Sequence, residues 1–264
     1  MKTGFIGCGN MAKAIISGIL KSGFAGNEDV LVYDISPEAR AYAENELMLD
    51  VRDGNISVAL DSDILVLAIK PVYMAEVIAE IRDSVPEDAL VITLAPGKTH
   101  EWLARQFERP VRLVRIMPNT PAMAGEGITA LCPNELVSDE ELAKAVALCE
   151  SFGQTEIVPE KLIDVVSAVS GSSPAFVFMF IEALADGAVA EGMSRQAAYK
   201  FAAQTVLGSA KLMQVTGKHP GELKDMVCSP GGTTIEGVEV LEEMSFRGAV
   251  AGAVRACVEK SKNL

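Results

Sequence analysis

The sequence predicts an α/β protein, with a doubly wound, mainly parallel sheet over residues 1–158 and an all-helical domain over residues 159–264. In the first part, short β-branched runs alternate with helical segments, which is the pattern of βαβ units. After about residue 160 the strand pattern stops, and segments rich in Gly, Ala, Met and Leu have helical spacing. The 264 residues are enough to bury a core in each part.

Short apolar runs mark the expected strands. In order along the chain they are TGFIG, DVLVYD, DILVLAI, ALVITLA, VRLVRIM and GITALC. Segments with helical spacing separate them, for example residues 11–23 and residues 73–85. Because strands that alternate with helices pair in parallel, we expect helices to cover both faces of this sheet.

Two long helices are expected in the second part. One begins with Ser172 or Ser173 as its cap, has Pro174 in its first turn and ends at Gly192. The next begins at Ser194 and ends at Thr216–Gly217. The first helix is apolar nearly all the way round, which a helix facing water cannot be. About a hundred residues cannot enclose it alone, so we expect a homodimer in which a second copy covers it.

Composition excludes several classes of function. A formal charge of −13 disfavours nucleic acid and anionic membrane surfaces as partners. The five cysteines are scattered and the histidines number two, so the sequence predicts neither a disulfide framework nor a metal site, and reduced thiols favour the cytoplasm. We expect no secretory signal at the N-terminus, and we expect the longest apolar stretch, interrupted by Glu182 and Asp186, to be too short for a membrane span.

A glycine-rich turn follows the first expected strand. Residues 7–12 read G-x-G-x-x-A, where Gly7 permits a tight turn, Gly9 lets the backbone approach a pyrophosphate, and the following residues Asn10 and Met11 open a helix. The unpaired N–H groups of a helix N-terminus favour phosphates. The order of strand, turn and helix therefore predicts a Rossmann-type dinucleotide site rather than an ordinary glycine-rich turn.

The second expected strand ends in Asp34, at the position where such domains place an acid on the adenine ribose. Its charge would oppose the 2′-phosphate of NADPH. Ser36 and Arg40 could instead hold a phosphate, although Ser36 is equally well explained as a helix cap. The sequence therefore predicts NADPH or NADH as the cofactor and leaves the choice open.

Three further loops follow expected strands and should surround the nicotinamide, because ligands of open α/β sheets lie beyond the carboxyl ends of the strands. Their candidate cofactor residues are Ala68, Lys70, Pro71, Ala95, Gly97, Asn119 and Pro121. Each loop is also consistent with a plain turn.

A second candidate site lies at Ser229-Pro230-Gly231-Gly232, an irregular turn that leads into a helix expected to start near Thr233. Such a helix start binds anions, and a small carboxylate would fit. The hydroxyls of Thr233 and Thr234 lie at the same place. The alternative is that Thr233 only caps the helix, with Glu236 completing a capping box.

The run LKDMVCSPGGTTIEG at residues 223–237 resembles the signature of the pyrroline-5-carboxylate reductase family. Five other motifs fall in that family's order and spacing, namely FIGCGNMAKAIISG, LAIKP, RIMPNTPA, VSGSSPAF and FRGAVAGAV. The resemblance implies a Rossmann domain, a helical dimerisation domain, dimers that can form rings, and an active site where the domains meet. It also implies reduction of the cyclic imine 1-pyrroline-5-carboxylate to proline.

The resemblance also assigns roles to residues. Ser229, Gly231, Gly232 and Thr233 would hold the substrate carboxylate, and Thr234 would hydrogen-bond the ring nitrogen as the catalytic group. Many relatives have Asn-Arg where this chain has Asp34-Ile35, so a preference for NADPH is not implied.

A protonated imine needs no Lys or His acid, and we expect His100 and His219 to be structural. Lys200 and Lys211, which could serve a hydroxyacid reductase as acid–base groups, are expected on solvated helix faces. The rival interpretations are therefore another two-domain imine or hydroxyacid reductase, and a nucleotide-sensing protein without turnover.

Overall fold

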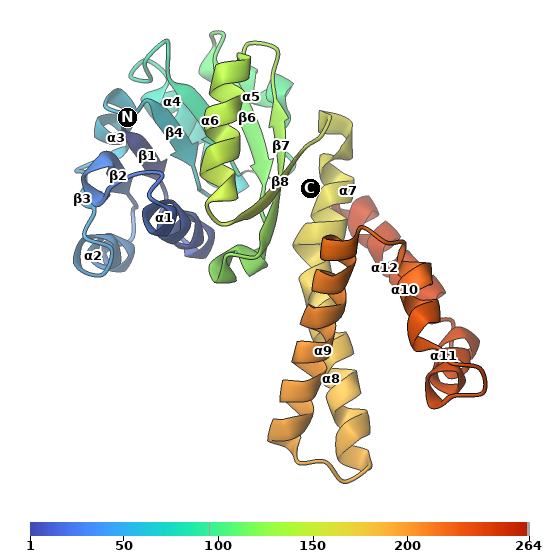
Figure 1. Cartoon of the computed structure of the whole chain (residues 1–264). Helices are drawn as coiled ribbons and strands as arrows, with labels where there is room; N and C mark the ends of the chain where they lie inside the picture. The colour runs from blue at the N-terminus through green and yellow to red at the C-terminus, as the bar shows by residue number, and fades with distance from the viewer. Residues whose placement is uncertain (95, 263–264) are drawn as a thin grey trace. The chain divides into compact units, whose positions relative to one another are not determined.

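The computed structural model describes residues 1–94 and 96–262, and it divides the chain into two compact units. Unit 1 comprises Met1–Gly171 together with the residues from Val258 on, and unit 2 comprises Ser172–Cys257. Figure 1 shows unit 1 as an α/β domain and unit 2 as helices alone, which confirms the predicted fold class. The domain boundary expected near residue 158 stays a prediction.

Unit 1 is built on a sheet with the strand order β3-β2-β1-β4-β5-β6-β7-β8. Its strands are β1 (Thr3–Ile6), β2 (Val30–Tyr33), β3 (Asp50–Val51), β4 (Ile64–Leu67), β5 (Leu90–Thr93), β6 (Arg112–Met117), β7 (Gly127–Pro133) and β8 (Gly153–Ile157). All neighbours pair in parallel except β6 and β7. The six expected strands are confirmed, while β3 and β8 are edge strands that the sequence analysis missed.

Helices cover both faces of this sheet (Figure 1). They are α1 (Asn10–Ser22) and α6 (Asp139–Glu150) on one face, and α3 (Asn55–Leu60), α4 (Met74–Ile81) and α5 (His100–Phe107) on the other. The helix α2 (Pro37–Asn45) follows β2, and the short helices are η1 (Asn27–Asp29), η2 (Pro71–Tyr73) and η3 (Thr120–Ala124).

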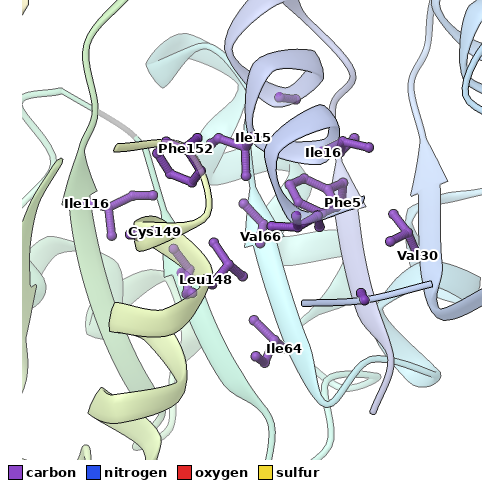
Figure 2. Packing of buried hydrophobic residues seen from close by; sticks show 14 of the residues in the cluster. Phe5, Ile15, Ile16, Val30, Ile64, Val66, Ile116, Leu148, Cys149 and Phe152 are labelled. Atoms are coloured by element: carbon purple, nitrogen blue, oxygen red, sulfur yellow. The ribbon is translucent and has the colours of Figure 1, made fainter. Parts of the chain in front are cut away.

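The core of unit 1 has one apolar cluster on each face of the sheet. Figure 2 shows the first cluster, in which Phe5 and Val66 of the strands meet Ile15 of α1 and Leu148 and Phe152 of the α6 segment. All five side chains are at most 1% exposed. The sheet and its helices therefore form a closed core from one chain, and this core fixes the strand ends that carry the predicted site residues.

A continuous helical segment, Glu160–Ala190, leaves the sheet after β8. It consists of η4 (Glu160–Leu162), α7 (Ile163–Val166), a π-helix η5 (Ser167–Ser172) and α8 (Ser173–Ala190). The expected start is confirmed in that α8 begins at Ser173, with Ser172 at the N-cap position and Pro174 in its first turn, but Ser172 has a helical backbone and its side chain makes no cap bond. Pro174 is still at the start of α8, but it lies inside a longer helical segment.

The π-helix has a physical explanation in Pro174. A proline inside a helix donates no hydrogen bond to the carbonyl four residues earlier, which here belongs to Ser170. The side-chain amide of Asn119 donates to that carbonyl at 3.1 Å. A loop of the sheet domain therefore supplies the partner that the proline withholds, and the widened π turn accommodates the ring.

The segment Glu160–Ala190 is also long and apolar enough to cross a membrane by length and composition, and 11% of its most apolar window is buried in the single chain. The expectation that this stretch falls short of a membrane span is therefore wrong on length. The reason is that the helix begins upstream of Pro174, where the sequence analysis placed its start. A helix in the interface of a soluble protein passes the same test.

The other helices of unit 2 are α9 (Arg195–Thr216), α10 (Pro220–Val227), α11 (Thr233–Glu243) and α12 (Phe246–Ser261). Ser194 caps α9 through the N–H of Ala197, and Gly217 ends it in a left-handed conformation, as expected. The helices α8 and α9 lie side by side and pack through the buried alanines Ala185, Ala198 and Ala202. No other residue of unit 2 is buried among those that the structure describes.

Candidate functional site

The turn between β1 and α1 has the geometry of a phosphate-binding loop. Gly7 has φ of +97°, and a Cβ there would lie 2.5 Å from the carbonyl oxygen of Ala68 at the end of β4. Gly9 is the N-cap of α1, and a Cβ there would meet nothing within 4 Å. The first turn of α1 contains no acidic residue. The structure thus brings Gly7 and Ala68 together and leaves open space over unpaired N–H groups, which fits a pyrophosphate.

Asp34 ties the next loop to this turn. One carboxylate oxygen accepts from the backbone N–H of Cys8 at 2.6 Å, and the other accepts from the N–H of Ser36 at 2.8 Å. Burial raises the pKa of the Cys8 thiol, so the side chain of Cys8 stays neutral at physiological pH. Asp34 is therefore held at the coenzyme end of β2, the position from which such an acid reaches the ribose.

The side chains after Asp34 have local partners. The Ser36 hydroxyl accepts from the N–H of Ala39 at 3.1 Å, so it caps α2, and it donates to the carboxylate of Glu38 at 2.6 Å. Arg40 donates to the carbonyl of Asp34 at 2.7 Å. The capping explanation of Ser36 is therefore present in the structure, and its role in binding the coenzyme stays a prediction.

The loops after β4, β5 and β6 carry the other predicted coenzyme residues. Lys70 is exposed at the start of η2, followed by Pro71, and it makes no ion pair with any residue in the described parts of the chain. Gly97 is exposed, with φ of +72°. Ala95 lies outside the described residues.

Asn119 differs from these exposed residues because it is only 8% exposed and its side-chain amide makes two hydrogen bonds. Its oxygen accepts from the N–H of Ile128 at 3.0 Å, and its nitrogen donates to Ser170. Pro121, in η3, is half-buried beside it. The side chain of Asn119 therefore holds the loop in shape, and any contact with a coenzyme would come from this loop's backbone.

The sequence analysis missed a charged cluster in unit 1. Arg115 of β6 has a side chain that is 7% exposed and donates to Glu160 at 2.5 Å, and Glu160 also accepts from the N–H of His100 at 2.7 Å. The ring of His100 is 3.0 Å from the carbonyl of Cys132. A cavity of about 420 Å³ borders this cluster and reaches Gly97. An arginine in the middle of the apolar run VRLVRIM was the clue in the sequence.

Both titratable partners in this cluster have lowered pKa values. Burial lowers the pKa of His100, and the charge of Glu160 only partly offsets this effect. Desolvation would raise the pKa of Glu160, but the N–H of His100 and the guanidinium of Arg115 outweigh it. The cluster is therefore neutral His100 beside an ion pair, and His100 has the structural role that was expected.

The second predicted site is an ordered turn before α11. Gly231 has φ of +65°, and Gly232 donates to the carbonyl of Ser229 at 3.0 Å. A Cβ on Gly232 would collide with the Ser229 hydroxyl. Because Gly232 is the N-cap, Thr233 and Thr234 are the first residues of the helix.

The proposed capping box at Thr233 is absent, since α11 has no side-chain cap bond. Both threonines are exposed, and their N–H groups belong to the unpaired first turn. This arrangement presents backbone donors and two hydroxyls together, so it can hold a small carboxylate and a second polar atom. His219 caps the preceding helix by accepting from the N–H of Gly221 at 3.1 Å, which confirms its expected structural role.

Two other expectations concern lysines and metals. Lys200 and Lys211 are exposed on α9, as expected for solvated faces. Within residues 1–94 and 96–262, no group of three or more His, Cys, Asp and Glu side chains is arranged to hold a metal ion.

Comparisons with known proteins cover the whole chain. Residues 160–264 match the family model described as pyrroline-5-carboxylate reductase dimerisation, and residues 2–97 match the one described as NADP oxidoreductase coenzyme F420-dependent. The pyrroline-5-carboxylate reductase of Escherichia coli (strain K12) is 49% identical, covering 100% of this chain and 98% of that protein. The corresponding reductase of Methanosarcina acetivorans is 41% identical, covering 100% and 97%.

Solved structures agree. A pyrroline-5-carboxylate reductase from Coxiella burnetii superposes with a TM-score of 0.93 at 33% identity, over 99% of this chain and 97% of that chain. The Plasmodium falciparum pyrroline carboxylate reductase with NADP bound superposes with a TM-score of 0.90 at 32% identity, over 100% and 97%. With relatives this similar over their full lengths, and with the glycine turn and the Ser229–Thr234 turn both in place, the chain belongs to the pyrroline-5-carboxylate reductase family.

Proposed function

We propose that this protein reduces 1-pyrroline-5-carboxylate to L-proline with NADH or NADPH. The observation that carries the proposal is the start of α11, where Gly232 is the N-cap and the N–H groups of Thr233 and Thr234 are unpaired beside two hydroxyls. A small cyclic imino acid offers the carboxylate and the ring nitrogen that such a site can bind. The turn after β1 fits the pyrophosphate of the coenzyme.

The chain's residues mainly bind and orient the reactants. The bound coenzyme supplies the hydride from carbon 4 of its dihydronicotinamide ring. The backbone of Ser229, Gly231, Gly232 and Thr233 holds the substrate carboxylate, and the Thr234 hydroxyl bonds the ring nitrogen. Two anchors fix which face of the ring accepts the hydride. No histidine acts as the acid, since His100 and His219 already have structural partners.

The coenzyme lies along the carboxyl ends of the parallel strands. Asn10 and Met11 open the helix that faces its phosphates, and Asp34 reaches its ribose. Lys70, Pro71 and Gly97 line the nicotinamide half, together with the backbone at Asn119 and Pro121. The exposed, unpaired ammonium group of Lys70 suits this role, because it is available to phosphate or ribose oxygens.

The working form of the protein is at least a homodimer. The apolar segment Glu160–Ala190 needs cover, and the family model that matches residues 160–264 is one for dimerisation. A second copy covers this segment in place of a lipid bilayer, and the dimers assemble further into a ring in the cytoplasm. Light scattering without detergent tests this point, because a membrane helix would aggregate and a ring would have several times the mass of the 28.0 kDa chain.

The activity test mixes purified protein, pyrroline-5-carboxylate and either NADH or NADPH, and follows the absorbance of the reduced coenzyme. We expect oxidation of the coenzyme that depends on substrate, with proline as the product. Coenzyme binding without oxidation would favour a nucleotide sensor. Oxidation of the coenzyme in the presence of the keto form of a β-hydroxy acid, but not in the presence of the imine, would favour a hydroxyacid reductase.

A further inference from the structure

The loop between β2 and α2 contains a charge that the proposed coenzyme site does not use. Asp34 is bonded to Cys8 of the glycine turn, so this loop is fixed beside the place where the adenine ribose would lie. NADPH differs from NADH only in a phosphate on that ribose. The groups around Ser36 therefore decide between the two coenzymes.

The two donors that Ser36 could offer to a 2′-phosphate are already engaged. The hydroxyl of Ser36 has one hydrogen, and it donates this hydrogen to Glu38 at 2.6 Å. The backbone N–H of Ser36 donates to Asp34 at 2.8 Å. The loop's guanidinium, Arg40, donates from one nitrogen to two backbone carbonyls. A phosphate that bound Ser36 would have to displace Asp34 or Glu38.

The charges in the loop also oppose a phosphate. Asp34 and Glu38 supply two carboxylates against the single guanidinium of Arg40. The hydrogen bond from Ser36 is the main cause that lowers the pKa of Glu38, so this carboxyl is fully ionised at neutral pH. A phosphate oxygen at hydrogen-bond distance from the Ser36 hydroxyl would lie no more than about 5 Å from the Glu38 carboxylate, and the two anions would compete for the one hydroxyl hydrogen.

We propose that Glu38, bonded to the Ser36 hydroxyl, is a specificity-determining residue that weakens binding of NADPH relative to NADH. The inference rests on the proposed function, because it assumes that the site binds these coenzymes. Repulsion between a carboxylate and a phosphate at about 5 Å in a water-like dielectric corresponds to roughly a tenfold loss of affinity. The charge of Asp34 acts in the same direction.

The test replaces Glu38 by Gln, which keeps the size and the hydrogen-bonding capacity of the side chain and removes its charge. The dissociation constants of NADH and NADPH are measured by coenzyme fluorescence on the full-length protein, without substrate. We expect Glu38→Gln to shift the ratio of the two constants about tenfold toward NADPH. The matched control is Glu44→Gln, an exposed glutamate near the end of the same helix. Glu44 lies about 9 Å from Glu38 along the helix axis, which is about one Debye length. We therefore expect Glu44→Gln to leave the ratio of the two dissociation constants unchanged.

Measuring the two dissociation constants at several salt concentrations distinguishes an effect of the Glu38 charge from an effect on the structure. If Glu38 acts by its charge, the shift should shrink toward zero in about 1 M KCl, where the Debye length is about 3 Å. A loss of helix stability in the variant would instead weaken both coenzymes by the same factor at every salt concentration. An unchanged ratio, or the same ratio in both variants, overturns the inference while leaving the proposed function intact. Failure of the wild-type protein to bind either coenzyme overturns both.

Discussion

Unit 1 and unit 2 differ in whether a single chain buries enough apolar side chains to form a closed core. In unit 1, the strands and helices enclose side chains such as Phe5, Ile15 and Phe152, which are at most 1% exposed. In unit 2, the buried residues are three alanines between α8 and α9. Large apolar side chains there, such as Phe178 and Phe201, are 65% and 66% exposed. A single copy therefore buries the core of unit 1, whereas it leaves large apolar side chains of unit 2 exposed.

The glycines inside helices show the same contrast. A Cβ on Gly18 of α1 would lie 2.8 Å from the Cβ of Phe152, so close packing within the chain requires this glycine. A Cβ on Gly187 of α8 or Gly208 of α9 would meet nothing within 4 Å. A mid-helix glycine costs about 1 kcal/mol relative to alanine. In unit 1 the chain itself explains that cost, whereas no contact within unit 2 explains it, and we propose that close packing against a second copy does.

The largest expected effect comes from placing a charge on the exposed apolar surface of α8. Burying a phenylalanine contributes about 1.5–3 kcal/mol, and a two-fold interface contains each residue twice. Phe178→Glu should therefore weaken the dimer by more than about a hundredfold. Analytical ultracentrifugation over a range of protein concentrations measures this directly.

The matched control is Leu60→Glu, the same kind of change at an apolar residue of unit 1 that is 55% exposed. It should leave the mass of the assembly unchanged. A Phe178→Glu protein with wild-type mass and activity would show that α8 is covered by something other than a second copy.

The next effect concerns the start of α11. Thr234→Ala removes one neutral hydrogen bond to the substrate nitrogen, which should cost about 1–3 kcal/mol and lower activity roughly ten- to a hundredfold. Most of the loss should appear in turnover if the bond tightens as the nitrogen becomes an amine. Steady-state rates with pyrroline-5-carboxylate measure the effect.

Thr234→Ser keeps the hydroxyl and should recover much of the rate, while the dimer mass should stay the same in both variants. If the alanine variant keeps both turnover and substrate affinity, Thr234 is only a helix-start residue and the proposed substrate pose is wrong.

A smaller effect is expected from the charged cluster of unit 1. Glu160→Gln leaves the guanidinium of Arg115, 7% exposed, without its ionic partner. Because the Glu160 side chain is itself 34% exposed, the loss should be about 1–2 kcal/mol, less than for a fully buried pair. Chemical denaturation measures it, and the value should not depend on protein concentration, since the cluster lies within one chain.

The pH dependence of this difference follows from the lowered pKa of Glu160. A carboxyl with a lowered folded-state pKa stabilises the fold above its ordinary value of 4.5 and loses that contribution as the pH falls through the folded-state value. The wild type and Glu160→Gln should therefore differ most at neutral pH and converge in acid. A constant difference at all pH values would mean that the ion pair is not its source.

The sequence predicts most of the strands and helices of unit 1, because each is marked by a local pattern of apolar residues and turn residues. Each expected strand is an apolar run, and the first three end at turns that Gly7, Asp34 and Lys70 mark. The missed strand β8 reads GQTEI, a partly polar edge strand whose pairing is decided by its neighbour β7. No periodicity in five residues could have shown it.

Long-range partners explain the other errors. Pro174 looks like a helix start, and only the amide of Asn119, 51 residues upstream of Ser170, shows how a helix passes through that point. Arg115 stands out in its strand, but its partner Glu160 is 45 residues away. From the sequence Ser36 could be a cap or a phosphate ligand, and only the structure shows its cap bond to Ala39 and its bond to Glu38. Local sequence therefore predicts where the site residues lie, and tertiary contacts decide what their side chains can still bind.

An effect of similar size separates the two units most directly. Gly187→Ala and Gly18→Ala make the same change in the middle of a helix. Gly18→Ala should destabilise unit 1 by about 1–3 kcal/mol at any protein concentration, because the new methyl group meets Phe152. For Gly187→Ala, the chain alone predicts a gain of about 1 kcal/mol from helix propensity. We expect a loss of about 1–2 kcal/mol instead, because we propose that a second copy packs against α8 at this glycine, where an added methyl group would overpack the contact. That loss should shrink as the protein is diluted toward the dissociation constant of the dimer, since it belongs to the dimer and not to the chain. Thermal unfolding at several protein concentrations measures both variants, and a Gly187→Ala protein that is more stable than the wild type at every concentration would place this face of α8 in water.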